Sequence, residues 1–454
     1  MELRLVQALL DDHRLVDAHE EAVLRTALAV ARLYKVRHEG RDVGVGAFLE
    51  PFKDEISRRL GPVLLAEKIQ RTQLLPHLKD LKERTLATRA QVVRHFSERI
   101  PETAIDREIR HKALVMVLGG GGGTGYVYAG AMGLLDEYGL KPQLLVGTSI
   151  GAVLAMFRSR VAIFDLDEIM AIVRSLSWRK LFRVISTQNK YGLPAALRLF
   201  LRSGIGRWFG ADHPEVGGVR LSQLPIRTIV TVSGIRKGKL PRPVEFYERM
   251  IAAPRSMLQP LGLARGVAGM VSAIAEFYSR PDVLARIHLG ADDLTSEFDA
   301  LDAAGFSSAL PGVIHYDVLR ADQRMHELLG DMLADRGVSR LIDGGLVDNL
   351  PARAAWRAVH KGQIGTRNAF ILALNGFSMK LMTPLWLPLQ RLAEVNVAPN
   401  RAWAHQVIDF KRTLSPLELV PSVQTFGDAI AMGRDQVASS VPLLARMLAP
   451  LPRL

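Results

Sequence analysis

Five consecutive glycines, at positions 119–123, directly follow a short apolar run at 113–118. Glycine loses more conformational freedom on folding than any other residue, so such a run indicates that the fold needs bare backbone here. Between a strand and a helix, bare backbone serves either to donate N–H groups to an oxyanion or to bind a phosphate. The run therefore predicts a strand, a loop that binds negative charge, and a helix, in that order.

A second unit of the same kind follows the glycine run. A buried-strand pattern at 143–147 precedes a sharp turn and an apolar helical pattern at 151–157. Short apolar runs at 227–234, 340–343 and 369–374 indicate further strands. Alternating strands and helices are typical of an α/β fold, so we predict a mostly parallel central sheet flanked by helices.

The hydrophobic patterns and the distribution of glycine and proline divide the 454 residues into three parts. Residues 1–112 carry apolar side chains at spacings of three and four, which predicts a helical N-terminal domain, and nothing in it indicates a chemistry. Residues 113–375 form the α/β domain. Residues 376–454 alternate helical patterns with proline-broken loops, and we expect a C-terminal extension that packs on the α/β domain.

The composition narrows the chemistry and the partners. The chain has no cysteine, which excludes disulfides, zinc–thiolate sites and thiol catalysis. The net charge of +13 favours anionic partners, yet no zinc-finger or RNP-like motif indicates nucleic acid. Peripheral contact with an anionic membrane fits better, beside the simpler explanation that excess arginine serves solubility. The first 20 residues lack a signal-peptide pattern and no long uncharged apolar run occurs, so we expect a cytoplasmic location.

The segment Gly147-Thr148-Ser149-Ile150-Gly151 lies between a predicted strand and a predicted helix. A serine at this place sits on a tight turn with its hydroxyl projecting from the sheet edge, and flanking glycines avoid collisions within the turn. The helix that follows directs its N-terminus toward the serine and favours negative charge there. The G-x-S-x-G pattern also arises by chance, but its context makes Ser149 the candidate nucleophile.

Nucleotide binding is the alternative use of the glycine run, which contains a formal G-x-G-x-x-G. A dinucleotide site needs an acidic residue about 20 positions further on. None occurs between Glu137 and Asp165, and Tyr126 stands where a P-loop would have lysine. The sequence therefore disfavours a nucleotide, and it indicates no other cofactor and no metal.

A third signal is Asp343-Gly344-Gly345 at the end of a predicted strand. Alone it indicates only a turn. The glycine loop, the G-x-S-x-G segment and the later D-G-G, in this order, resemble the patatin-like phospholipase family. The segments 306–311 and 343–351 extend the resemblance, which covers residues 113–375. It implies a catalytic domain with a three-layer α/β/α fold.

The resemblance also implies roles for single residues. Ser149 matches the nucleophile and Asp343 its partner in a serine–aspartate dyad without histidine. The remaining matches are the oxyanion loop (Gly120, Gly121 and Gly122), the backbone N–H of Ile150 and the elbow glycines (Gly147 and Gly151). The implied reaction is hydrolysis of a lipid ester through an acyl-serine, of the phospholipase A or lysophospholipase type, with a phospholipid as the expected substrate.

Two alternatives stay open. The family usually has Arg or Lys where this chain has Thr124, which leaves room for a weakly active or inactive lipid-binding or scaffold protein. A histidine triad is the other, because His360 and His405 follow Asp343 in the order acid then histidine. His360 lies in a helical pattern and His405 lacks a loop signal, so the dyad is favoured.

Two stretches combine aromatic side chains with cations or prolines. Residues 178–209 carry Trp178, Phe182, Trp208 and Phe209 among arginines, which fits either a membrane interface or an amphipathic helix pair with its aromatics in the core. The stretch 381–389 around Trp386 has the same ambiguity, and either stretch could serve as a lid or a docking surface.

Overall fold

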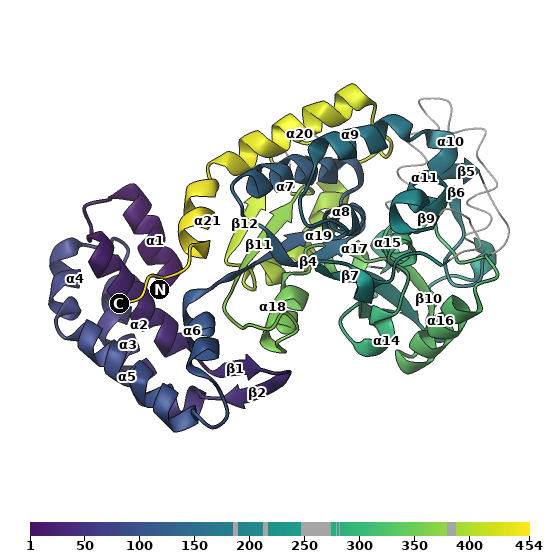
Figure 1. Cartoon of the computed structure of the whole chain (residues 1–454). Coiled ribbons are helices and arrows are strands. Elements are labelled where there is room, and N and C mark those ends of the chain that lie inside the picture. Colours follow the sequence, from purple (N-terminus) through teal and green to yellow (C-terminus); the bar gives the residue numbers. More distant parts are fainter. Residues whose placement is uncertain (185–188, 212–216, 247–273, 278, 281, 379–386) are drawn as a thin grey trace.

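The computed structural model describes residues 1–184, 189–211, 217–246, 274–277, 279–280, 282–378 and 387–454. A smaller, mainly helical lobe adjoins a larger lobe built on a sheet, and both chain termini lie in the smaller lobe (Figure 1). The end of the chain is attached there by a backbone hydrogen bond from Leu451 N–H to Arg110 O. The C-terminal extension therefore runs from the larger lobe back to the smaller one.

The smaller lobe has a hydrophobic core of its own, which contains Leu24, Leu28 and Phe96. Its elements are α1 (Glu2–Asp11), α2 (Ala18–Arg32), β1 (Lys35–His38), β2 (Arg41–Gly44), α3 (Gly46–Leu64), α4 (Arg71–Leu78), α5 (Leu81–Phe96) and α6 (Glu102–Arg110). A capping box formed by Asp17 and Glu20 begins α2. The β1–β2 hairpin is a feature that the helical pattern did not indicate.

Seven strands form the main sheet of the larger lobe, as far as the chain is described. They are β3 (Ala113–Leu118), β4 (Pro142–Thr148), β7 (Arg227–Arg236), β8 (Leu284–Leu289), β10 (Val338–Asp343), β11 (Ala369–Asn375) and β12 (Gln406–Asp409). The pairs β12–β11, β11–β3, β3–β4 and β4–β7 are parallel, whereas β8 and β10 pair antiparallel with β7. The predicted α/β fold, with a mostly parallel sheet flanked by helices, is confirmed.

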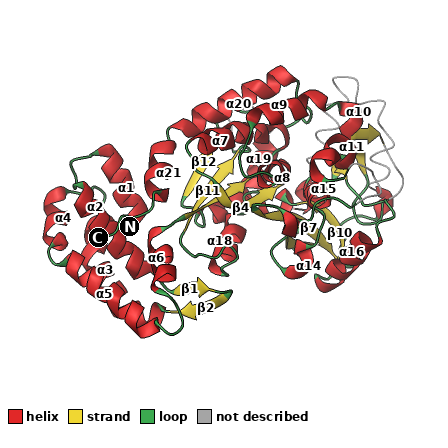
Figure 2. Ribbon diagram, viewed as in Figure 1, coloured by secondary structure: helices red, strands yellow, loops and turns green. Residues whose placement is uncertain are grey.

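Helices cover both faces of this sheet (Figure 2). Along β3, Leu114, Met116 and Leu118 belong to one hydrophobic core, whereas Val115 and Val117 belong to another. Successive side chains of a strand point to opposite faces, so an all-apolar strand needs cover on each side. The first face carries α7 (Val127–Glu137) and α8 (Ile150–Ser159), with α9 (Leu166–Ser175) and α20 (Val423–Ala438) packed outside; the second carries α18 (Ala352–His360) and α19 (Leu387–Arg401).

Two strands end head to head against β7. Strand β4 pairs with β7 up to Thr148 opposite Thr231, and β10 pairs with the next stretch of β7 down to Asp343 opposite Val232. Strand β8 pairs with both stretches of β7, so β4 and β10 share the other edge. The carboxyl ends of β4 and β10 therefore meet, although about 200 residues separate them in the sequence.

The remaining elements are a smaller sheet, further helices and 3₁₀ turns. A smaller sheet contains β5 (Phe182–Val184), β6 (Ala195–Leu199) and β9 (Gly312–His315). The further helices are α10 (Trp178–Leu181), α11 (Leu201–Ile205), α14 (Asp293–Ser296), α15 (Ala300–Ser307), α16 (Gln323–Asp335), α17 (Gly345–Asp348) and α21 (Val441–Leu448). The 3₁₀ turns are η1 (Gly122–Tyr126), η2 (Gly206–Phe209) and η3 (Leu221–Gln223).

The stretch 178–209 is not the helix pair considered above. It contains short helices and two short strands, with Phe182 and Phe209 buried and Trp178 about half exposed. The aromatic side chains thus divide between core and surface. Trp386 lies outside the described residues.

Candidate active site

Ser149 occupies the sharp turn between β4 and α8. Its backbone has φ +54° and ψ −126°, in a region that residues with a side chain rarely adopt. A Cβ on Gly151 would lie 2.2 Å from the carbonyl oxygen of Leu118, so only glycine allows the helix to approach the sheet this closely. Backbone strain of this kind persists where surrounding structure enforces it, and it is concentrated at functional sites.

Ser307, at the end of α15, fixes the turn from the other side. Its hydroxyl accepts a hydrogen bond from the Ser149 backbone N–H at 2.8 Å and donates one to Thr231 O at 2.7 Å. The Thr148 hydroxyl donates to Asp348 O at 2.9 Å. The backbone of the serine turn is therefore tied to β7 and to the segment that follows Asp343.

Asp343 ends β10 beside this turn and is buried, with 5% of its surface exposed. Burial raises the pKa of Asp343 to about 6, although hydrogen bonds with the Gly345 N–H and the Ser149 side chain lower it. The Gly345 N–H donates to Asp343 Oδ1 at 2.7 Å. No lysine or arginine among the described residues forms an ion pair with Asp343, so the carboxylate keeps a proton affinity suited to a base near neutral pH.

Some backbone N–H groups of the glycine loop donate hydrogen bonds within the protein, and others do not. Those of Gly120 and Gly123 donate to the carbonyl oxygens of Asn349 and Pro416. The N–H groups of Gly121, Gly122 and Ile150 have no backbone acceptor in the described part of the chain. Because these three residues line the cavity next to Ser149, their N–H groups are the ones free for an oxyanion.

The conformation of the loop explains why it needs glycine. Gly121 and Gly122 have φ of +140° and +58°, in the region that disfavours side chains. Thr124 is buried and its hydroxyl donates to Gly121 O at 2.9 Å, so it stabilises the loop from within. The residue that departs from the family pattern thus serves the loop's own structure.

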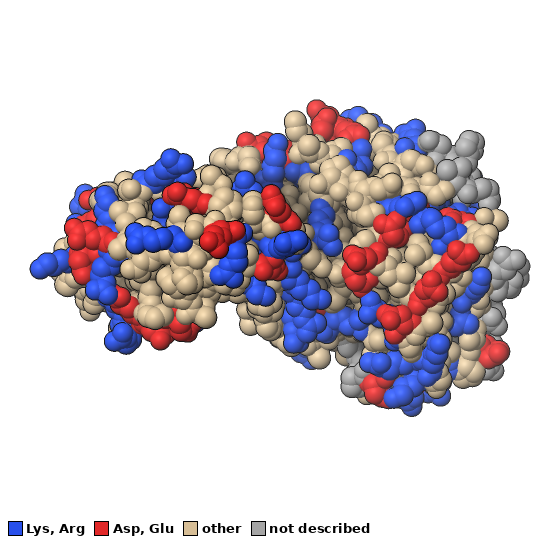
Figure 3. Space-filling view, turned by 60° about the horizontal axis from the view of Figure 1, so that its bottom comes forward, with Lys and Arg blue, Asp and Glu red and all other residues tan. Residues whose placement is uncertain are grey.

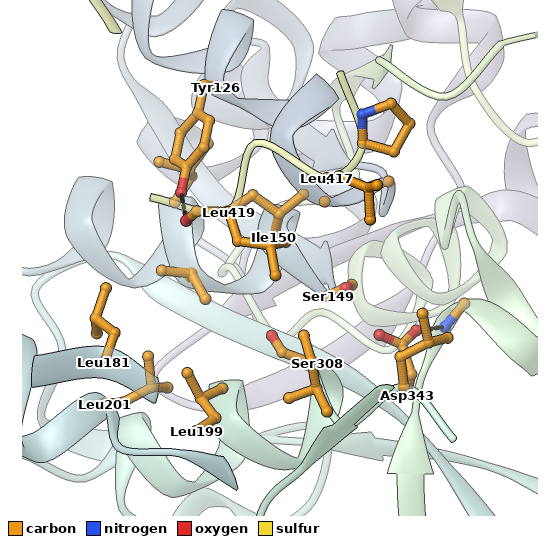
Figure 4. Close-up of a pocket in the computed structure, with 18 of the residues that line it drawn as sticks. Tyr126, Ser149, Ile150, Leu181, Leu199, Leu201, Ser308, Asp343, Leu417 and Leu419 are labelled. Atoms are coloured by element: carbon orange, nitrogen blue, oxygen red, sulfur yellow. Dashed lines mark hydrogen bonds between the residues drawn. The ribbon is translucent and has the colours of Figure 1, made fainter. Parts of the chain in front are cut away.

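A cavity of about 240 Å³ opens at Ser149. Ser149, Ser308 and Asp343 lie together at one end of it and Leu181, Leu199 and Leu201 at the other (Figure 4). Most of its wall is aliphatic or aromatic. The site therefore joins a small polar end to a long apolar one.

The C-terminal extension contributes to this cavity. Pro416, Leu417, Leu419 and Phe426 line it, and the Tyr126 hydroxyl donates to Leu419 O at 2.6 Å. Sequence reasoning did not place these residues in the site, because their contacts reach the glycine loop across almost 300 residues.

Two further polar side chains line the cavity, Ser308 and Asn349. No sequence pattern indicated either of them as a separate site residue. Both are at least nine-tenths buried. The Ser308 hydroxyl and the Asn349 Nδ2 lack a hydrogen-bond partner within the described residues. Each such group retains an unmet capacity to bind a polar atom of a ligand.

Neither candidate histidine reaches the cavity. His360 accepts or donates a hydrogen bond with the Tyr34 hydroxyl at 2.8 Å and stacks on Trp356. His405 Nδ1 accepts a hydrogen bond from the Ile371 N–H at 2.9 Å. No histidine is present among the described residues that line the cavity. Nor do the described residues contain a group of three His, Asp or Glu side chains that could hold a metal ion.

A serine on a strand-to-helix turn, beside a carboxylate and a loop of free N–H groups, is an arrangement of hydrolytic α/β enzymes. The family model described as patatin-like phospholipase matches residues 116–356, more than half of the 454-residue chain. The chain belongs to this family, which supports a hydrolase of the lipid esterase kind. A search of curated proteins finds no match. None of the described helices is both long and apolar enough to cross a membrane.

Proposed function

We propose that this protein hydrolyses the acyl esters of phospholipids through an acyl-serine formed on Ser149, with Asp343 as the base. The observation that carries the proposal is the strained Ser149 turn, which opens on an apolar cavity next to a buried carboxylate without a paired cation. The elbow glycines Gly147 and Gly151 hold this turn against the sheet.

In the first half of the reaction, Asp343 accepts the Ser149 proton while Oγ attacks the ester carbonyl carbon. The carbonyl oxygen becomes an oxyanion, and the N–H groups of Gly121, Gly122 and Ile150 stabilise it. When the C–O bond breaks, the protonated Asp343 returns its proton to the leaving alkoxide. Water then repeats the sequence on the acyl-serine and releases a fatty acid.

The apolar part of the cavity supports a lipid acyl chain as the group bound to the carbonyl. Leu181, Leu199 and Leu201 lie at the end remote from Ser149 (Figure 4). Each methylene transferred from water to such a wall contributes about 0.8 kcal/mol. An acyl chain of several methylenes would therefore bind much more tightly than a short acyl group.

Two exposed apolar side chains support contact with a lipid surface. Leu417 lines the cavity and is 44% exposed, and Trp178, followed by the exposed Arg179 and Lys180, is 45% exposed. Figure 3 shows Lys and Arg side chains beside Asp and Glu side chains over the face it displays. We therefore assign membrane contact to the Trp178–Lys180 segment and Leu417, and not to the net charge as such.

A comparison of wild type with Ser149→Ala tests the proposal. On phospholipid vesicles and on a short-chain chromogenic ester, wild type should release product and Ser149→Ala should not. A fluorophosphonate should label wild type only. Equal release by both proteins would refute the reaction, and lipid binding without any release would favour the scaffold alternative. His360→Ala and His405→Ala should keep nearly full turnover, because neither side chain reaches the cavity.

A further inference from the structure

Asn349 follows α17 and contributes to the site in two ways, through its backbone oxygen and through its side-chain carboxamide. Its backbone oxygen accepts a hydrogen bond from the Gly120 N–H at 3.1 Å, which fixes the glycine loop to the segment after Asp343. Its side chain is part of the cavity wall, and the residue is only 5% exposed. The backbone and the carboxamide of Asn349 can therefore be examined separately by substitution.

The Asn349 Nδ2 has no hydrogen-bond partner in the part of the chain that is described. A buried amide donor without an acceptor carries its full desolvation cost, so native structures contain few of them. Such a donor in a cavity wall indicates that the acceptor arrives with the ligand. In an ester, the strongest acceptor that forms during the reaction is the oxyanion.

The space between the carboxamide and the nucleophile is kept open by a glycine. A Cβ on Gly120 would lie 2.5 Å from Asn349 Oδ1 and 3.3 Å from Ser149 Cβ. A side chain at Gly120 would thus occupy the path between the two residues. The carboxamide atom nearest this path is Oδ1, and a half turn about χ2, which keeps the shape of the group, brings Nδ2 to the same place when an oxyanion forms. This gives Gly120 a role that its own N–H, already bound to Asn349 O, cannot have.

We propose that the Asn349 carboxamide is a further oxyanion donor, which hydrogen-bonds the ester carbonyl oxygen once Ser149 has attacked. The assignment rests on the proposed function, because it needs an oxyanion at Ser149. It adds a neutral side-chain donor to the backbone N–H groups of the glycine loop. A donor that acts only on the transition state affects turnover more than substrate binding.

Kinetics of Asn349→Ala and Asn349→Asp test this role. Asn349→Asp keeps the shape and removes the donor. Both variants should lower kcat about 10²–10³-fold with KM little changed, and both should slow inactivation by a fluorophosphonate to a similar degree. Asn396→Ala is the matched control. Asn396 lies on α19, its amide donates to Leu346 O of α17, and its side chain is not part of the cavity wall. Asn396→Ala should keep kcat, and all variants should unfold near the wild-type temperature.

Three outcomes separate the possibilities. Unchanged kcat in Asn349→Asp would overturn the proposal while leaving Ser149 hydrolysis intact. A shift in the acid limb of the kcat/KM profile, without loss at its plateau, would also overturn it, because the amide would then act on Asp343. If wild type itself hydrolyses no ester and no fluorophosphonate labels Ser149, the proposed function fails before Asn349 is tested.

Discussion

Asp343 ends β10 and Asp348 ends the short helix α17 that follows it, and burial raises the pKa of Asp343 to about 6 and that of Asp348 to about 7. Asp343 lines the cavity, where its partners are Ser149 and the Gly345 N–H. Asp348 is not part of the cavity wall. Its two oxygens lie 2.9 Å from Asn400 Nδ2 and 3.4 Å from Arg286 Nε.

The difference between these two regions lies in the groups around each carboxylate. Asp348 pairs with the Arg286 cation of β8 and accepts a hydrogen bond from the Asn400 amide of α19. These two contacts attach α17 to β8 and α19. Asp343 has no ion pair with a described residue, so its proton affinity stays available to a hydroxyl. Burial alone therefore does not define a base; the absence of a neighbouring cation does.

The largest expected effect separates the two aspartates by activity. Asp343→Asn should lower kcat about 10³–10⁴-fold, because the amide cannot accept the Ser149 proton. Asp348→Asn should keep turnover within a few fold, because the amide can still accept from Asn400. Ester hydrolysis by both variants at pH 8 measures the contrast. Equal losses in the two variants would mean that the turn as a whole, and not the base, had been damaged.

The second prediction concerns stability. The folded pKa of Asp343 lies above its unfolded value, so its protonated form favours folding, and this contribution is lost as the pH rises through about 6. Asp343→Asn should therefore be more stable than wild type at pH 8, by at most about 3 kcal/mol. The gain should disappear toward pH 4. Urea unfolding at both pH values measures it, and a variant less stable than wild type at pH 8 would contradict the desolvation of Asp343.

The smallest effect is the pH dependence of the wild-type enzyme. Because Asp343 must be deprotonated to act, kcat/KM should fall about tenfold per pH unit below a midpoint near 6. Asp348→Asn should leave this limb in place, since Asp348 takes no part in proton transfer. A limb that moves in Asp348→Asn would show that the two carboxylates titrate together.

Much of the fold could be predicted because the central strands are buried on both faces. The apolar runs at 113–118, 143–147 and 369–374 correspond to β3, β4 and β11 within one residue at each end. Strands β8 and β12 gave no such run: β8 contains Arg286 and His288, and β12 lies at the edge of the sheet. Edge strands and half-buried strands lack the continuous pattern that identifies a central one.

The site was less accessible to sequence reasoning where it depends on distant contacts. Ser149 and Asp343 stand out because each stands at the carboxyl end of a strand with glycines beside it. The roles of Ser307 and Asn349 depend on a backbone N–H that the fold brings to them from far along the chain. For Gly120 the sequence suggested an oxyanion donor, whereas the structure gives its N–H to Asn349 O.

The segment around Pro416 and Leu417 closes the cavity on the glycine loop, and it is synthesised more than 260 residues after Ser149. A nascent polypeptide emerges from its N-terminus and folds domain by domain. The nucleophile therefore leaves the ribosome long before the wall that completes its pocket. The pocket is therefore incomplete until this segment has been made, and a chain truncated before it would keep Ser149 but lack the Pro416–Phe426 part of the cavity wall.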